Sequence, residues 1–212
     1  MSIGITQRVE ICENYGEVRD CLDQEWTNLI NVAGFDLVII PNAIRNIENW
    51  LENKNVSGII LTGGNDLSHL INAKNPAPNR DETERKILKW VSKNKVPVLG
   101  VCRGMQLMND FLSGSLSRIE FHSGLNHEIK VIENKIISES LSSVNSYHDW
   151  GMFEDDLSPK LKVIATASDG SIEAVEHRYL PWIGVMWHPE RGNSKALTLN
   201  RNVMLLNKIF SK

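Results

Sequence analysis

The stretch Val98-Leu99-Gly100-Val101-Cys102-Arg103-Gly104-Met105-Gln106 decides the fold of this chain. An apolar run over residues 96–101 predicts a buried strand, which stops at a Gly-x-Cys-x-Gly turn. After the turn, apolar residues recur at helical spacing, at Met105, Leu107, Met108, Phe111 and Leu112. The pattern therefore predicts a sharp strand-to-helix corner that carries a cysteine, with glycines that allow the tight fold of the backbone.

Cys102 is the candidate nucleophile of the chain. The corner places its thiol at the N-terminus of a helix, where unpaired N–H groups and the helix dipole favour an anion. At an ordinary pKa near 8.5 only about 3% of a thiol is thiolate at pH 7, and a fall of roughly two units makes the thiolate the major form. A buried core cysteine is the alternative, but the two glycines and the strand-to-helix switch favour the nucleophile.

His188 is the candidate base, because it follows an apolar strand predicted over residues 182–187. Residues i and i+2 of an extended segment project to the same side, and Pro189 favours that extended state in the residue before it. His188 and Glu190 therefore point together, and the carboxylate fixes the tautomer of the imidazole and stabilises its cation. We predict a catalytic triad of Cys102, His188 and Glu190.

Two backbone N–H groups are candidate donors to an oxyanion. One belongs to Arg103, which follows the nucleophile on the new helix. The other belongs to Gly64, in the glycine turn that follows a buried strand predicted over residues 56–61. Losing one such donor typically costs about 10²–10³ in rate. A plain strand-exit turn is the alternative interpretation of Gly63-Gly64.

Strands and helices alternate through the first half of the chain. The pattern predicts strands over residues 3–6, 35–40, 56–61 and 96–101, helices over residues 18–33, 43–53 and 81–94, a polar loop through Gly16 and a surface loop over residues 74–79. This alternation favours an α/β fold with a parallel sheet covered by helices on both faces. Ligands of such sheets bind at the carboxyl ends of the strands, where both glycine turns open.

The second half of the chain has a different pattern. Short alternating strands over residues 129–137 and 162–176, with a turn at Asp169-Gly170, predict an antiparallel extension of the sheet. A closing helix is expected over residues 195–210. We expect one domain over residues 1–212, because the chain shows no repeat, low-complexity tract or linker.

The composition is that of an ordinary globular protein, with 42% hydrophobic and 23% charged residues. The net charge of -3 and the pI of about 6.1 argue against a nucleic-acid partner. Three cysteines without close pairing favour a reducing compartment, so we interpret Cys12 and Cys21 as structural or incidental. No signal peptide and no apolar run of roughly 18 residues is present, so we expect a cytoplasmic protein without a membrane partner.

Two further groups of residues have simple interpretations. His122 and His127 are metal-ligand types, but a five-residue spacing with no third ligand in register favours core or solvated histidines. We therefore expect no metal. The stretch Arg80-Asp81, with Glu82 and Glu84, is typical of an acidic helix N-terminal turn, where the helix dipole favours negative charge.

Four motifs in this order resemble those of the class I glutamine amidotransferase superfamily. They are Thr62-Gly-Gly64-Asn-Asp66, Gly100-Val-Cys102-Arg-Gly104-Met-Gln106, Asn145-Ser-Tyr-His148 and Met186-Trp-His188-Pro-Glu190. Cys-Arg-Gly-x-Gln and Arg80-Asp81-x-x-Glu84 resemble the free-standing γ-glutamyl hydrolases, including those that cleave γ-glutamyl-γ-aminobutyrate. The opening Gly4-Ile-Thr-Gln-Arg8 and the compact length resemble most closely the γ-glutamyl-CDP-amidate hydrolases of capsular phosphoramidate synthesis.

The resemblance implies a flavodoxin-like three-layer α/β sandwich, the same triad, and an oxyanion hole from Gly64 and Arg103. It also implies that a γ-glutamyl group is held by Gln106, Asn145, Ser146, Tyr147 and His148. The implied enzyme is a free-standing cysteine hydrolase without a cofactor, which cleaves a small γ-glutamyl amide, either γ-glutamyl-CDP-amidate or another γ-glutamyl amine, through a thioester and releases glutamate.

Two alternatives remain open on the sequence alone. The chain is a glutaminase subunit that delivers ammonia to a separate synthetase, or it is a non-catalytic binding or stress protein of the same fold. A homodimer and a synthetase complex are the partner arrangements that fit these interpretations. The complete triad argues against the non-catalytic alternative.

Overall fold

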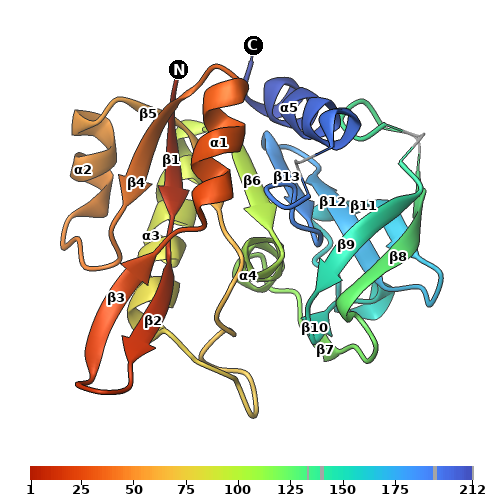
Figure 1. Cartoon of the computed structure of the whole chain (residues 1–212), viewed down its shortest axis with the longest axis horizontal. Helices are drawn as coiled ribbons and strands as arrows, with labels where there is room; N and C mark the ends of the chain where they lie inside the picture. Colours follow the sequence, from red (N-terminus) through yellow and green to blue (C-terminus); the bar gives the residue numbers. More distant parts are fainter. Residues whose placement is uncertain (133, 139–140, 193–194, 212) are drawn as a thin grey trace.

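A nine-stranded sheet runs through the centre of the computed structural model, which describes residues 1–132, 134–138, 141–192 and 195–211 (Figure 1). The strand order is β4-β1-β5-β6-β13-β12-β11-β8-β9. The parallel part comprises β4 (Asp36–Ile40), β1 (Ser2–Thr6), β5 (Val56–Leu61), β6 (Val98–Val101) and β13 (Trp182–Val185). The antiparallel part comprises β12 (Ile172–His177), β11 (Leu161–Ala167), β8 (Ser123–Val131) and β9 (Ser143–Tyr147). The predicted parallel sheet with an antiparallel extension is confirmed.

Helices cover both faces of the parallel part, which gives the three layers. On one face α1 (Gln24–Val32) packs against α5 (Ala196–Phe210), and the two share a hydrophobic cluster with the sheet. The other face carries α2 (Ile47–Asn53), α3 (Pro78–Asn94) and α4 (Arg103–Phe111), which share a second cluster. Neighbouring residues of one strand belong to different clusters, Ile60 to the first and Ile59 to the second, as the alternation of strand side chains requires.

The first helix begins later than the sequence predicts, and a β-hairpin stands where a polar loop through Gly16 is expected. Strands β2 (Arg8–Cys12) and β3 (Glu17–Cys21) pair antiparallel, and α1 begins at Gln24 after the N-cap Asp23. The prediction of a helix from residue 18 is therefore wrong in its first turn and a half. The hairpin contacts the glycine turn after β5, because the amide of Asn65 bonds both backbone groups of Val9 at 2.9 Å.

Smaller differences concern the ends of elements in both halves. Helix α2 begins at Ile47 rather than residue 43, because the side chain of Asn46 caps it. The strand expected over residues 129–137 is displaced, since β8 spans Ser123–Val131, and β9 was not predicted as a strand. The short elements β7 (Ser117–Arg118), β10 (Trp150–Gly151) and η1 (Glu154–Asp156) complete the architecture. Among the described residues, no helix combines the length and apolar character that crossing a membrane requires.

Candidate active site

The predicted corner is present between β6 and α4, and Cys102 stands at its apex. Cys102 is the N-cap of α4 and adopts a left-handed φ of 51°, a conformation that costs energy in a residue with a side chain. Its N–H donates to the carbonyl of Val185 in β13 at 2.8 Å. Gly104 allows the helix to approach β5, because a Cβ there would lie 2.2 Å from the carbonyl oxygen of Leu61. The fold thus holds the cysteine in a fixed, strained position.

His188 comes from the strand next to that of Cys102. Strands β6 and β13 pair in parallel with Val101 opposite Val185, so both residues emerge at the same sheet edge. Both border Gly63, where a Cβ would lie 2.6 Å from His188 Cε1 and 3.4 Å from Cys102 Cβ. The structure therefore brings the predicted nucleophile and base together.

Glu190 lies behind the imidazole, on the side away from the thiol. His188 Nδ1 is 2.7 Å from Glu190 Oε1, and both side chains are buried. Burial alone would lower the pKa of His188, but the hydrogen bonds and charges of Cys102 and Glu190 outweigh it and raise that pKa to about 9. The imidazole is therefore held in its cationic form at neutral pH, next to the sulfur.

Asn145 fixes the backbone of His188 rather than lining the pocket. Its amide nitrogen donates to the His188 carbonyl at 2.9 Å, and its amide oxygen accepts from the His188 N–H at 2.8 Å. The hydroxyl of Ser146 donates to the carbonyl of His122. These two predicted substrate-binding side chains are thus already occupied by protein partners.

A polar pocket opens in front of Cys102. Its walls are formed by Gly64, Asn65, Asp66, Lys74, Asn75, Cys102, Arg103, Gln106, Tyr147, His148, Asp149 and Trp150. Both predicted oxyanion-hole residues and three of the predicted substrate-binding residues, Gln106, Tyr147 and His148, are among them. The side-chain nitrogen of Gln106 donates to the carbonyl of Trp150 at 2.7 Å, which joins α4 to the opposite wall.

An ion pair in the pocket wall was not anticipated from the sequence. Lys74 Nζ lies 2.7 Å from Asp149 Oδ2, and this contact holds the pKa of the Asp149 carboxyl below its usual value. No local signal links the two residues, because they are far apart in the chain. The guanidinium of Arg191 also stacks 4.3 Å from the ring of Tyr147, next to the pocket.

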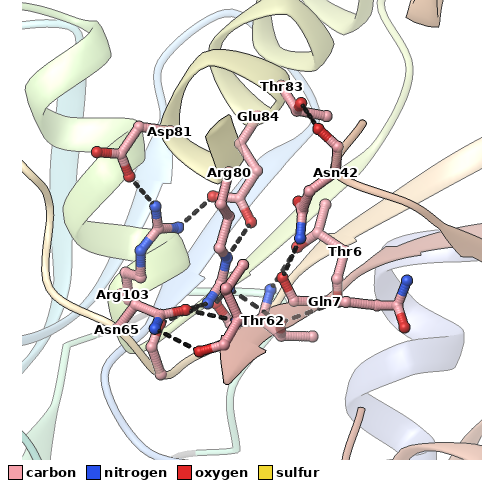
Figure 2. Close-up of polar contacts among 12 residues, drawn as sticks. Thr6, Gln7, Asn42, Thr62, Asn65, Arg80, Asp81, Thr83, Glu84 and Arg103 are labelled. Carbon is pink, nitrogen blue, oxygen red and sulfur yellow. Dashed lines mark hydrogen bonds and ion pairs between the residues drawn. The ribbon is translucent and has the colours of Figure 1, made fainter. Parts of the chain in front are cut away.

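A buried charge network supports the glycine turn and the start of α4 (Figure 2). Arg80 Nη2 donates to the carbonyl of Thr62 at 2.7 Å, and Arg80 Nη1 donates to the carbonyl of Gly64. Glu84 pairs with Arg80 at 3.0 Å and also with Arg103, which in turn pairs with Asp81. The interpretation of this stretch as an acidic helix N-terminal turn is wrong for Glu84, whose side chain is fully buried.

The pKa values of this network follow from its two cations and its burial. Burial raises the pKa of Glu84, but the charges of Arg103 and Arg80 outweigh it and leave that pKa below its usual value. Burial and the neighbouring Arg103 lower the pKa of Arg80 to about 10. All three groups are therefore charged at neutral pH, and their pairing holds both predicted oxyanion donors in place.

Three histidines and a glutamate gather behind the wall formed by His148, and three of these residues, His122, His148 and Glu173, are placed so that they could hold a metal. The structure places His122 and His127 next to His148 and Glu173, which are not in register with them in the sequence. The third and fourth residues come from distant segments, which is why the spacing of the first two gave no sign of them.

Residues 2–190 match the protein family described as Peptidase C26. The chain belongs to the peptidase C26 family. Among its relatives, the gamma-glutamyl-CDP-amidate hydrolase of Campylobacter jejuni is 33% identical over 217 residues, which cover 100% of this chain and 98% of that protein. The gamma-glutamyl-gamma-aminobutyrate hydrolase of Escherichia coli is 30% identical over 228 residues, which cover 91% of this chain and 88% of that protein. A glutamine-hydrolyzing GMP synthase component of Pyrococcus abyssi is 34% identical over 166 residues, which cover 78% of this chain and 81% of that component.

A solved structure confirms the fold of this peptidase C26 chain. A glutamine amidotransferase of Thermotoga maritima superposes with a TM-score of 0.76, over 100% of this chain and 99% of that one. The sequence identity is 13%, so the likeness establishes the three-layer architecture and not the activity. The resemblance to class I glutamine amidotransferases noted in the sequence is confirmed.

Proposed function

We propose that this peptidase C26 protein is a hydrolase that cleaves a γ-glutamyl amide bond and releases glutamate. The observation that carries the proposal is that Cys102 and His188 lie together against Gly63, with Glu190 bonded to the imidazole. The name of the Campylobacter jejuni relative, a gamma-glutamyl-CDP-amidate hydrolase, supports γ-glutamyl-CDP-amidate as the substrate.

The first half of the proposed reaction forms a thioester. The sulfur of Cys102 attacks the γ-carbonyl carbon, and its proton resides on His188, whose cation Glu190 stabilises. The carbonyl oxygen gains the charge and accepts hydrogen bonds from the N–H groups of Gly64 and Arg103, both in the pocket wall. The carbon–nitrogen bond then breaks, and the departing nitrogen takes its electron pair and the proton of His188.

The second half of the proposed reaction consumes the thioester. A water molecule attacks the same carbonyl carbon while His188 accepts its proton, and the oxyanion again lies at the two N–H groups. The carbon–sulfur bond breaks, free glutamate leaves, and the proton returns to the sulfur of Cys102. Every proton-transfer group in these steps belongs to the chain itself.

The γ-glutamyl group would lie between α4 and the segment that follows β9. Its ammonium and carboxylate need polar partners in a partly buried pocket. Gln106 and the backbone of Tyr147 and His148 border this space, and Lys74 and Asp149 provide one charge of each sign. We assign this wall to the amino-acid end of the substrate.

A comparison of substrates tests the proposal. Purified protein and the Cys102→Ala variant are incubated with γ-glutamyl-CDP-amidate, γ-glutamyl-γ-aminobutyrate and glutamine, and released glutamate is measured. We expect wild-type protein to turn over the nucleotide amide fastest, and the variant to be inactive. Mass spectrometry of rapidly quenched wild-type protein should show a glutamyl adduct on the peptide that contains Cys102. Turnover by Cys102→Ala at the wild-type rate would refute the mechanism.

A glutaminase that serves a separate synthetase is the second candidate function, favoured by the likeness to the GMP synthase component of Pyrococcus abyssi. In that case the same panel would show cleavage of glutamine alone. Ammonia release would also rise when a synthetase is added. A γ-glutamyl-CDP-amidate hydrolase would not require a synthetase for its activity. A protein that cleaves none of the three compounds and forms no adduct would support the non-catalytic alternative.

A further inference from the structure

Three histidines surround the carboxylate of Glu173 behind the pocket wall. Glu173 Oε2 is 3.3 Å from His127 Nε2, while Glu173 Oε1 is 3.6 Å from His148 Nε2 and 3.7 Å from His122 Nδ1. The side chains of His122, His148 and Glu173 are only 8%, 1% and 1% exposed. The four residues, termed here the His₃Glu cluster, come from three segments of the antiparallel extension, at β8, after β9 and in β12.

The atoms that face one another in this cluster have no hydrogen bond within the part of the chain that the structure describes. This holds for both carboxylate oxygens of Glu173 and for one ring nitrogen of each histidine. The contact at 3.3 Å is close enough, but its angles are not those of a hydrogen bond. Buried polar atoms normally have partners, so five such atoms around one point require an explanation.

The second ring nitrogen is already occupied in two of the histidines. His122 Nε2 lies 3.0 Å from Asp169 Oδ2, and His148 Nδ1 lies 3.1 Å from the carbonyl of Trp150. A carboxylate or carbonyl in this position fixes the tautomer and leaves the lone pair of the other nitrogen directed into the cluster. Metal-binding histidines almost always have such an outer partner.

The spacing of the donor atoms matches one metal. In a tetrahedral zinc site with bonds of about 2.0–2.1 Å, neighbouring ligand atoms lie roughly 3.3–3.4 Å apart. Glu173 Oε1 lies 3.6 Å from His148 Nε2 and 3.7 Å from His122 Nδ1, just above this value, and one donor atom of each of these three residues lies within 4.8 Å of the others. His127 Nε2 instead faces the second carboxylate oxygen, Oε2, at 3.3 Å. Imidazole and carboxylate are common ligands of zinc, and a water molecule can complete a four-coordinate site that has three protein ligands.

We propose that His122, His148 and Glu173 bind one zinc ion. The ion joins the start of β8, the end of β9 and β12, since His122 precedes Ser123, His148 follows Tyr147, and Glu173 lies in β12. His148 also borders the pocket in front of Cys102. The zinc ion therefore fixes the pocket wall and takes no part in bond cleavage.

Metal binding by the full chain in the Cys102→Ala background tests the site, because this variant removes the thiol as a competing ligand. We expect the chelator-stripped protein to take up one Zn²⁺ per chain, and Co²⁺ to give the visible absorption bands of a tetrahedral site. At about 100 times the dissociation constant, Zn²⁺ should raise the Tm by about 5–10 °C. The result does not depend on hydrolysis, so failure of the proposed function would leave it unaffected.

Matched variants locate the metal. Glu173→Gln should weaken Zn²⁺ binding at least about 100-fold, and Asp169→Asn, which changes only the outer partner of His122, should weaken it about 10–100-fold. Glu176→Gln, on the same strand but paired with the exposed Lys162, should bind like the parent. If Glu173→Gln does not fold, the Zn²⁺ affinity of Asp169→Asn and the Co²⁺ spectrum of the parent protein test the proposal in its place. Substoichiometric uptake, or equal affinity in the parent and Asp169→Asn, would overturn the proposal.

Discussion

Asn145 holds His188 by its backbone, donating to the His188 carbonyl at 2.9 Å and accepting from the His188 N–H at 2.8 Å. Asn145 lies in β9 at the far edge of the sheet, whereas His188 follows β13. The stretch of chain that carries the proposed base is thereby tied to the strand whose end forms the pocket wall. Asn145 is a positioning residue in this arrangement.

Asn145→Ala should lower kcat by about 10²-fold with little change in KM, because a displaced imidazole no longer meets the sulfur in the right geometry. Steady-state kinetics on the substrate identified by the panel would measure both constants. Asn126→Ala is a matched control, since Asn126 pairs with Asn145 across the strands but is exposed. A rise in KM at constant kcat would instead favour the direct substrate contact that the sequence suggests.

Glu190→Gln should lower kcat by up to about 10⁴-fold, because the carboxylate that orients the imidazole and stabilises its cation is lost. In wild-type protein the pKa of His188 is about 9, so kcat/KM should fall as pH rises through this value. Removing the charge of Glu190 lowers that pKa, so the alkaline limb should move to lower pH. A limb that stays near its wild-type position in the variant would contradict the assigned contact.

The same pKa has a consequence for stability. Because the folded pKa of His188 is raised from 6.5 to about 9, its contribution to the free energy of unfolding is complete below pH 6.5 and is lost as pH rises toward 9. Denaturant unfolding of wild-type protein and Glu190→Gln across this range measures it. Wild-type protein should lose more stability than the variant between these two pH values.

Glu84→Gln should destabilise the fold by about 3–5 kcal/mol, since two buried guanidiniums would lose their shared carboxylate. Denaturant unfolding gives the free energy directly. Glu82→Gln, on the same helix and in an exposed pair with Lys86, should leave the stability unchanged. Because the pKa of Glu84 is below its usual value, the contribution of this carboxylate is lost as pH falls into the acid range.

Gly63→Ala should lower kcat by about 10²-fold, because the added Cβ would lie 2.6 Å from His188 Cε1 and force the ring to move. Contact with Cys102 Cβ at 3.4 Å is tolerable, so alkylation of Cys102 by iodoacetamide should still occur. Urea unfolding checks that the variant is folded. Wild-type kcat in a folded variant would show that His188 does not lie over Gly63.

The corner at Cys102 was predictable because its signals are local: an apolar run, two glycines and a helical repeat that follow one another in the sequence. The hairpin of β2 and β3 was missed for a physical reason. Val18 and Leu22 continue the helical spacing of α1, which favours a helix in the sequence. The apolar residues Ile11 and Val18 of the hairpin point outward and are 61% and 66% exposed, so they do not mark a buried strand face.

The His₃Glu cluster shows what sequence reasoning cannot reach. Its members become neighbours through the register of the antiparallel strands, which pairs Ser123 with Tyr147 and places β12 beside β11. Nothing near His127 indicates that a carboxylate from residue 173 will lie 3.3 Å away. The burial of Glu84 is a similar case, because an acidic residue early in a helix normally faces water.

Because β6 and β13 are hydrogen-bonded neighbours, the gap between sulfur and imidazole is set by the spacing of adjacent strands. The chain between Cys102 and His188, from α4 to β12, is one long connection that leaves β6 and returns to its neighbour β13. Natural selection can lengthen, shorten or reshape the outer part of this connection without separating the proposed nucleophile and base. We therefore expect that the choice of leaving group can change in this fold without a change in the residues that react.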